Sequence, residues 1–339
     1  MSVRRRTLLR LLAAGLGSAA VPLACARPIG QQRGMKQRPT PDAPLTPPPA
    51  WYAMAIQGAY AADRASYRLA VGGMCDRALS LGDAALRDLP VRRAPVTLAC
   101  VGNGPNGDLF SSALFRGARI ADILDAAGVA PSVTGAVITG LDGFAAIQSI
   151  EDLRRPESMI AYDMGTSEGD LAALPIEHGF PARILTPGLY GYMQPKWIDG
   201  ITLVDEGGAQ EVLRASVGYI GGKMQLASGF TAPRGGEIAA GDQEVIGWAF
   251  GDGRSIGAVD LRVDDGPWER ADIVFNTPHD DAPPYLWCLW RFTWRATPGL
   301  HTLTSRATYV GGETQIEGRA FPYSGGSLAS VSIRVKGAS

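Results

Sequence analysis

The hydrophobic pattern of residues 51–212 mixes helical and strand-like segments. Residues 120–127 carry apolar side chains at helical spacing, and Gly128 directly after them is a typical stop signal for a helix. Residues 136–140 and 200–204 are short runs of apolar and β-branched side chains, which are typical of strands. There is no long repeat of β-α-β units and no Gly-x-Gly-x-x-Gly fingerprint, so the pattern predicts an α+β domain without a Rossmann dinucleotide site.

The pattern of residues 222–339 is that of short strands with frequent turns. Residues 245–250 and 258–263 are strand-like, and Asp-Asp-Gly at 264–266 predicts a hairpin turn after the second of them. Residues 301–307 alternate between apolar and polar side chains. This pattern predicts an immunoglobulin-like β-sandwich. Three tryptophans in this part are predicted to pack in its core or at an interface: Trp287, Trp290 and Trp294.

The composition indicates a globular protein and disfavours nucleic acid and anionic membrane surfaces as binding partners. The chain has 339 residues, 46% of them hydrophobic and 19% charged, which is ample material for the cores of two domains. Its formal net charge of -1 gives no electrostatic basis for binding nucleic acid or an anionic membrane surface. The 4 cysteines form no CxxC pair, and there are only 3 histidines, which argues against a disulfide scaffold, a zinc cluster or a metal site built from histidines.

Residues 1–26 are predicted to be an export signal. Three arginines at 4–6 form a basic start, and the apolar stretch 11–24 is too short and too interrupted by glycine for a comfortable membrane span. Residues 5–10, Arg-Arg-Thr-Leu-Leu-Arg, fit a twin-arginine signal, the type that exports folded proteins. An ordinary secretory signal is the alternative. Both predict a periplasmic or otherwise exported protein.

The segment after this signal leaves its processing open. Ala24-Cys25-Ala26 fits a signal-peptidase site, while Leu23-Ala24-Cys25 resembles the end of a lipoprotein box, which would anchor the protein to a membrane through Cys25. Residues 27–50 are rich in proline and are predicted to form an extended, poorly ordered linker.

Cys100 is the first candidate for chemistry. It ends an apolar, β-rich run and is followed by a glycine-rich loop that begins Val101-Gly102-Asn103. A thiol presented where a strand ends can serve as a nucleophile or as a soft metal ligand. The alternative is an inert core thiol, which is the more common fate of a single cysteine.

His178, Arg183 and Lys196 form a second candidate group. They have the side-chain types that hold a phosphate-bearing cofactor, and a glycine-rich connection between Arg183 and Lys196 could bring them to one rim. Three unrelated surface charges are the alternative, and the spacing by itself favours that interpretation. Asp142 lies in a Gly-Leu-Asp-Gly sequence, where an ordinary turn residue is nearly as good an interpretation as a ligand-binding one.

Five motifs in register resemble the molybdenum enzymes of the sulfite-oxidase type. The similarity extends over nearly all of residues 51–339 and is greatest to bacterial exported members, because Cys100 is followed by a loop rich in glycine and asparagine. The five motifs lie at residues 97–103, 161–164, 178–183, 187–191 and 196–197.

The resemblance implies a site and an activity. It implies that Cys100 binds molybdenum beside the dithiolene of one molybdopterin, that Asp142 hydrogen-bonds the pterin, and that His178, Arg183 and Lys196 hold the pterin and its phosphate. It implies a sulfite-oxidase-type mixed α/β domain followed by a dimerisation-type sandwich, and hence a possible homodimer. The expected reaction is two-electron oxygen-atom transfer on a small substrate. Because no CxxCH haem motif is present, electrons would pass to an external carrier such as a c-type cytochrome or a membrane subunit.

The chain departs from sulfite oxidases where substrate binds. Those enzymes have a Phe-Tyr-x-Arg-Asn-His type segment, whereas residues 51–56 read Trp-Tyr-Ala-Met-Ala-Ile and lack both the arginine and the histidine. An oxyanion needs cationic groups to offset its desolvation, so sulfite is a doubtful substrate. Tyr219 is the candidate for the catalytic tyrosine of the family.

Two other functions remain open. A cofactor-free exported binding or scaffold protein could keep the same fold. A cysteine hydrolase using Cys100 with His178 or His301 is a poorer interpretation, because no acidic residue stands at a recognisable spacing to orient the histidine.

Overall fold

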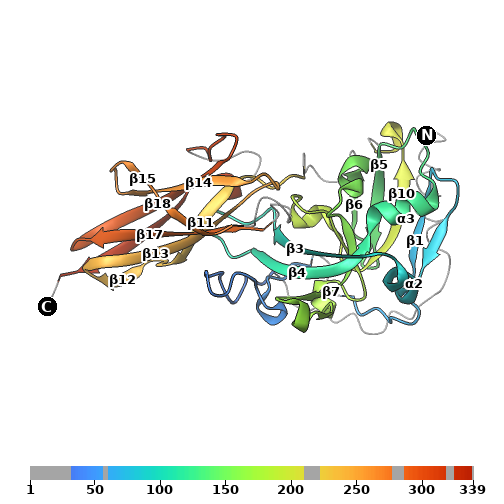
Figure 1. Ribbon diagram of the computed structural model, residues 1–339, viewed down its shortest axis with the longest axis horizontal. Helices are drawn as coiled ribbons and strands as arrows, with labels where there is room; N and C mark the ends of the chain where they lie inside the picture. Colours follow the sequence, from blue (N-terminus) through green and yellow to red (C-terminus); the bar gives the residue numbers. More distant parts are fainter. Residues whose placement is uncertain (1–31, 56–59, 210–221, 277–285, 318–323, 338–339) are drawn as a thin grey trace.

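The computed structural model shows a larger mixed domain joined to an elongated β-sandwich (Figure 1). The export signal with Cys25 and the candidate Tyr219 lie outside the part of the chain that it describes. No helix in the described part is long and apolar enough to cross a membrane. The described residues are 32–55, 60–209, 222–276, 286–317 and 324–337.

The larger domain contains two five-stranded sheets. The first has the order β2 (Leu79–Leu81), β1 (Leu69–Gly73), β10 (Ile198–Val204), β5 (Gly135–Gly140) and β6 (Ala145–Ser149). The second has the order β3 (Val91–Ala99), β4 (Phe110–Arg119), β7 (Met159–Gly165) and β8 (Ala172–Ala173), with β9 (Arg183–Leu185) also paired to β7. Only β1 and β10 pair in parallel here. Cys100 follows β3 and Arg183 begins β9 in the second sheet, whereas Lys196 lies just before β10 in the first.

Short helices cover the first sheet and close one of the two cores of this domain. The predicted helix is confirmed as α3 (Ile120–Ala127), and Gly128 ends it in a left-handed conformation with φ +70. Its apolar side packs with strands β1, β5 and β10, so the helical spacing in the sequence does mark a buried face. Two further α-helices are α2 (Asp83–Asp88) and α4 (Ile150–Arg154).

The predicted β-sandwich is confirmed. One sheet has the order β11 (Ala227–Ala232), β13 (Gly241–Phe250), β17 (Cys288–Ala296) and β16 (Asp272–Phe275). The other has the order β12 (Gly236–Ala239), β19 (Ala329–Lys336), β18 (Gly299–Tyr309), β14 (Ile256–Val263) and β15 (Trp268–Arg270). The predicted hairpin at 264–266 joins β14 to β15. In β19 buried and exposed side chains alternate strictly, as a strand with one face in a core requires.

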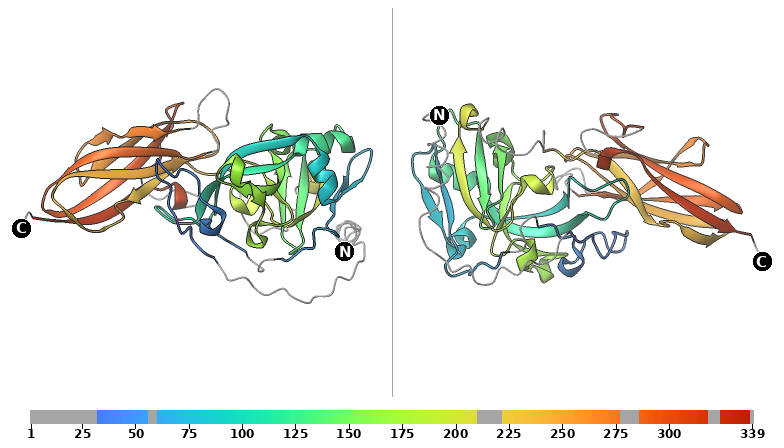
Figure 2. Two further views of the ribbon diagram at one scale, coloured as in Figure 1. Left: turned by 60° about the horizontal axis from the view of Figure 1, so that its bottom comes forward. Right: turned by 180° about the vertical axis from the view of Figure 1, so that it is seen from behind.

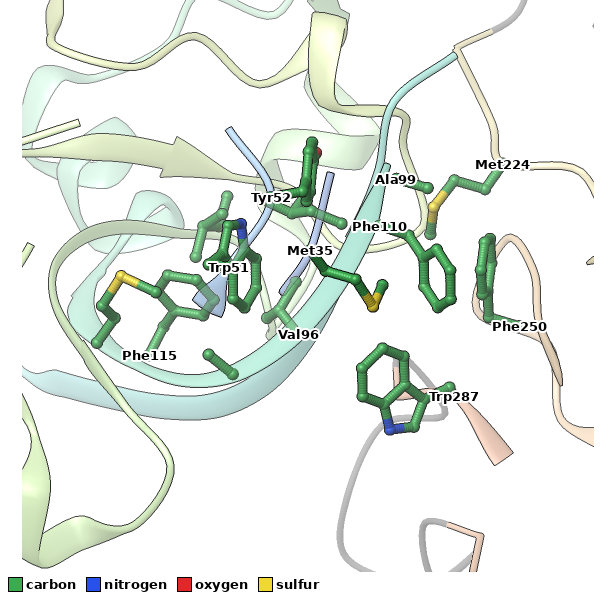
Figure 3. Packing of buried hydrophobic residues seen from close by; sticks show 14 of the residues in the cluster. Met35, Trp51, Tyr52, Val96, Ala99, Phe110, Phe115, Met224, Phe250 and Trp287 are labelled. Carbon is green, nitrogen blue, oxygen red and sulfur yellow. The ribbon is translucent and has the colours of Figure 1, made fainter. Parts of the chain in front are cut away.

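A shared hydrophobic core joins the two domains. Figure 3 shows Phe110 of the larger domain facing Phe250 and Trp287 of the sandwich, and all three side chains are buried. The ring centroids of Phe110 and Trp287 are 5.6 Å apart, and the backbone N–H of Trp287 donates to Thr97 Oγ1 at 3.1 Å. Trp287 is therefore an interface residue, whereas Trp290 and Trp294 belong to the core inside the sandwich.

The prediction of a poorly ordered linker is wrong for residues 32–50. We call residues 32–55 the N-terminal strap, which is drawn in blue in Figure 2 and lies along the junction of the two domains. The strap side chain of Met35 is buried between Val96 and Trp287 (Figure 3). The indole N–H of Trp287 also donates to Pro44 O at 2.6 Å. Apart from the short 3-10 helix η1 (Pro48–Ala50), the strap has no helix or named strand, and its carbonyls and apolar side chains contact both domains.

Candidate functional site

Cys100 lies directly after β3, at the mouth of a loop. Its backbone N–H donates to Leu109 O at 2.8 Å, and its carbonyl accepts from Asn103 N at 3.0 Å, so the thiol is held at a fixed place. The side chain is half-buried, and its Sγ lies 3.4 Å from the N–H of Gly102. Burial raises the pKa of the Cys100 thiol, and the hydrogen bond from Gly102 opposes that rise. The thiol is therefore only partly buried and packs against a hydrophobic core, and its chemical role stays a prediction.

The loop that follows Cys100 is held by the sandwich and by the strap. Asn106 has a positive φ of 54, and its Oδ1 accepts from the backbone N–H of Phe230 in β11 at 2.9 Å. The guanidinium of Arg38 in the strap donates to Asn106 O at 2.9 Å, Gly107 O at 2.8 Å and Phe230 O at 2.9 Å, and it also pairs with Asp108. The position of the thiol loop therefore depends on all three parts of the protein.

His178 is buried and neutral. It ends the 3-10 helix η3 (Ile176–His178), and Gly179 follows it with φ +114. Its ring Nε2 lies 3.0 Å from Pro48 O in the strap, and since a carbonyl only accepts, Nε2 carries the proton. Burial lowers the pKa of His178 to about 4. The strap thus fixes both the orientation and the tautomer of this imidazole.

Arg183 begins β9 and is a buried cation without a counter-ion in the described part of the chain. Its guanidinium donates to two carbonyls, His178 O at 3.2 Å and Gln194 O at 3.4 Å. Its Nε is buried and has no hydrogen-bond partner. Burial lowers the pKa of Arg183 to about 10. A charged group in this state is costly unless an anion completes its contacts.

Lys196 lies next to Arg183 and is buried in a similar way. Its Nζ donates to Met54 O at 2.8 Å and to Glu177 O at 2.9 Å, and it lies 4.4 Å from the centroid of the Trp197 ring. Burial, and then the charge of Arg183, lower the pKa of Lys196 to about 7.

Gly179 allows Arg183 and Lys196 to converge. A Cβ at Gly179 would lie 2.9 Å from the Cβ of Arg183 and 3.3 Å from that of Lys196. The structure therefore brings together the three basic residues that the sequence singled out, and the alternative of unrelated surface charges is wrong.

Asp142 lies in the turn between β5 and β6, close to Lys196. The turn is tied to the Lys196 segment because Leu141 N donates to Trp197 O at 2.9 Å. The carboxylate accepts from Phe144 N at 3.1 Å, and burial raises the pKa of Asp142. Its turn conformation and its place beside the basic group are both observed. Its role toward a pterin stays a prediction, as do the cofactor roles of the other four residues.

The structure adds residues that the sequence did not single out. Gln194 is buried, and its side-chain amide accepts from Thr186 N at 2.8 Å and donates to Leu189 O at 2.6 Å, which holds the glycine-rich loop beneath Arg183. Tyr52 in the strap is buried against the same core as Cys100. The sequence marked residues 51–56 only for the arginine and histidine they lack. No spacing rule connects Tyr52 with Cys100, about 50 residues further on, or with Arg183, about 130 residues further on.

The comparisons with known proteins agree with this arrangement. Residues 56–211 match the family model described as the oxidoreductase molybdopterin binding domain. Mitochondrial sulfite oxidase of Rattus norvegicus is 27% identical over 311 residues, covering 78% of this chain and 56% of that protein. Sulfite oxidase of Gallus gallus is 30% identical over 281 residues, covering 69% and 59%. The chain thus spans less than two thirds of the length of these relatives.

The fold also matches a solved structure along almost its whole length. The crystal structure of the sulfane dehydrogenase SoxCD from Paracoccus pantotrophus superposes with a TM-score of 0.74, covers 93% of this chain and 92% of that one, and is 21% identical. The mixed domain with its thiol loop and buried basic group, the family match and the curated relatives lead to one assignment. Residues 56–211 carry a molybdopterin-binding oxidoreductase domain, and the chain is similar to the sulfite-oxidase type of molybdopterin oxidoreductases.

Proposed function

We propose that this protein is a molybdenum-cofactor-dependent oxidoreductase that carries out two-electron oxygen-atom transfer on a small substrate. The observation that carries the proposal is the pair of buried basic side chains, Arg183 and Lys196, which converge beside Gly179. Neither forms an ion pair with a carboxylate in the described chain, and Arg183 Nε has no partner at all. An organic phosphate would supply the missing anionic oxygens, so the residues present fit the cofactor.

Each residue has a defined task in this proposal. Cys100 would bind the metal as a thiolate, a soft ligand that coordination keeps deprotonated. Arg183 and Lys196 would neutralise the phosphate, while His178 and Asp142 would hydrogen-bond and orient the pterin. The cofactor, when bound, supplies the redox and oxygen-atom chemistry, and the protein positions it and excludes water.

A cofactor-free scaffold is the weaker alternative because of the same two basic side chains. Without a bound anion the chain would keep two basic groups out of water, each costing free energy. A protein that only bound or bridged partners would gain nothing from that arrangement.

The partners and location belong to the proposal as well. We propose export through the twin-arginine signal to the periplasm. Attachment to a membrane through a lipid on Cys25 is compatible with this route. Electrons would pass to an external carrier, such as a c-type cytochrome or a membrane subunit. The sandwich, as in the family resemblance, would serve a homodimer.

Replacing the thiol tests the proposed function. The unchanged protein, produced in a host that makes molybdopterin, should contain about one molybdenum per chain, held through one strong cysteine ligand. Cys100→Ser should lose at least about 100-fold in activity while remaining folded, since the hydroxyl is a poor soft-metal ligand. Sulfite with ferricyanide, and dimethyl sulfoxide with a reduced viologen, test both directions of turnover.

Cys75→Ser is the matched control. Cys75 is a half-buried free thiol of the same domain, in an isolated bridge with Val129 and away from the site. It should keep both the metal and the activity. Full activity of Cys100→Ser, or no molybdenum in the unchanged protein, would rule the proposed function out.

A further inference from the structure

Three buried polar side chains connect the first sheet of the larger domain to the loop beneath Arg183. Gln148 lies in β6, Thr186 directly follows β9, and Gln194 follows the 3-10 helix η4 (Gly191–Met193). Each of the three is at most 2% exposed. Polar groups taken out of water are costly unless they are hydrogen-bonded, and a fully bonded set of them holds one arrangement of the chain.

Gln148 is bonded through both atoms of its side-chain amide. Its Oε1 accepts from Thr186 Oγ1 at 2.7 Å, and its Nε2 donates to Met193 O at the end of η4. The backbone N–H of Thr186 in turn donates to Gln194 Oε1 at 2.8 Å. One glutamine of the first sheet therefore fixes the two ends of the glycine-rich segment 187–193.

This set of bonds ends at the carbonyl of Gln194, one of the two acceptors of the Arg183 guanidinium. The bonds from Arg183 to His178 O and Gln194 O are 3.2 and 3.4 Å long, at and beyond the long end of the usual range, and Arg183 Nε is buried without a partner. The place of the guanidinium therefore depends on where these carbonyls are held. A shift of Gln194 O would move the N–H groups that Arg183 can direct at an anion.

We propose that Gln148 is a positioning residue of the anion site: through Thr186 and Gln194 it sets the place from which Arg183 binds a phosphate oxygen. Loss of Gln148 would weaken the binding of an anion although Arg183 and its charge remain. That the anion is the phosphate of the cofactor rests on the proposed function. The dependence of Arg183 on Gln148 does not.

The test uses inorganic phosphate as the probe. It is titrated by calorimetry into the full chain prepared without cofactor, at a temperature at which each variant is folded. Arg183→Gln should raise the dissociation constant by about 12-fold or more, the loss expected for a hydrogen bond from a charged group, which assigns the probe to this site. Gln148→Met keeps a side chain of similar length without the amide. It should raise the dissociation constant by roughly 2- to 12-fold, the factor for one neutral hydrogen bond.

Two variants of Thr186 separate positioning from stability. Thr186→Val removes the hydroxyl that bonds Gln148 and should weaken phosphate binding, whereas Thr186→Ser keeps the hydroxyl and should bind phosphate like the unchanged protein. If Gln148 and Thr186 only stabilised the fold, their loss would lower the melting temperature and leave the dissociation constant as it was. The Thr186 pair decides the question if Gln148→Met does not fold.

Gln315→Met is the matched control. Gln315 is a buried glutamine of the sandwich, and its amide accepts from Ser228 Oγ at 2.9 Å and donates to Ser327 O at 2.8 Å. Its replacement should lower the melting temperature and leave phosphate binding unchanged.

Two results would overturn the proposal. One is equal phosphate binding by Gln148→Met, or by Thr186→Val, and the unchanged protein. The other is the absence of any phosphate binding that Arg183→Gln weakens. A protein without molybdenum in which Gln148→Met weakens phosphate binding would end the proposed function but support this inference.

Discussion

Burial sets the charge of the three basic side chains around Gly179. His178 lies in a site where burial brings its pKa to about 4, and the same effect brings the pKa of Lys196 to about 7. Arg183 stays charged, because even its lowered pKa of about 10 lies well above neutrality. Arg183 is therefore a permanent cation and His178 is neutral. Lys196 changes its charge near neutral pH or when an anion binds beside it.

Lys196 should make stability rise with pH in the protein prepared without cofactor. Its pKa is lowered from 10.5 to about 7 in the folded state. Between these values the unfolded chain binds a proton that the folded chain does not, so the free energy of unfolding increases with pH, by at most about 1.4 kcal/mol per pH unit. Below pH 7 Lys196 is protonated in both the folded and the unfolded chain, so the full free-energy cost of burying its charge is present. Lys196→Met should remove this rise, as urea unfolding measured from pH 6 to 10 would show.

An exposed lysine provides the comparison for that experiment. Lys336 is on the surface and pairs with Glu237, so Lys336→Met should keep the slope of the unchanged protein. Identical slopes for Lys196→Met and the unchanged protein would show that Lys196 keeps an ordinary pKa when buried.

At the scale of elements, the loop after Cys100 is positioned by contacts from outside its own sheet. Asn106 meets two requirements at once, since its backbone adopts a positive φ and its side chain accepts from Phe230 N. Asparagine tolerates the left-handed region better than most residues, and its amide oxygen provides the acceptor. Arg38 then joins the loop carbonyls to the same strand, β11.

Asn106→Gly should loosen the contact between this loop and the sandwich. Glycine keeps the backbone conformation but removes the acceptor, which costs about 1 kcal/mol and gives about fivefold faster exchange of the Phe230 amide hydrogen. Asn106→Asp retains an acceptor oxygen beside Arg38 and Arg234 and should restore slow exchange. Hydrogen exchange followed by mass spectrometry measures both. Unchanged exchange in Asn106→Gly would mean that the loop is held without this bond.

At the scale of the whole molecule, the two domains are joined by a shared core and by the strap. Trp287 shows this best, because its ring packs on Phe110, its backbone bonds Thr97, and its indole bonds Pro44. A connection of this kind makes the two domains unfold together, since neither can open without exposing the aromatic cluster to water.

Trp287→Ala should separate the unfolding of the two domains. Removing this buried ring should cost about 3–5 kcal/mol and split one calorimetric transition into two. Trp268→Ala is the matched control, because Trp268 is only partly buried in the β15 hairpin and stacks on Arg262 and Arg306. It should cost at most about 1 kcal/mol and leave a single transition. A single transition in Trp287→Ala as well would show that the domains are coupled elsewhere.

Elements defined by neighbouring residues were predictable from the sequence. Helix α3 ends at Gly128 as expected, and the hairpin at 264–266 joins β14 to β15. Both depend on local spacing and on turn residues, which act within a few positions. The strap was mispredicted for the opposite reason. Its proline content disfavours long helices and strands, but it carries no information about partners such as Trp287, whose indole lies more than 240 residues further along the chain.

The sequence by itself determined the types of side chain available and the local elements that carry them: a thiol at the end of a strand, and basic residues on either side of a glycine-rich loop. The tertiary structure decided that Arg183 and Lys196 converge beside Gly179, that Arg183 Nε is buried without a partner, and that the strap fixes His178. Burial depends on segments distant in sequence, and burial determines which charges remain and which donors stay unpaired. The spacing of residues along the chain reveals neither the burial of a side chain nor its partners.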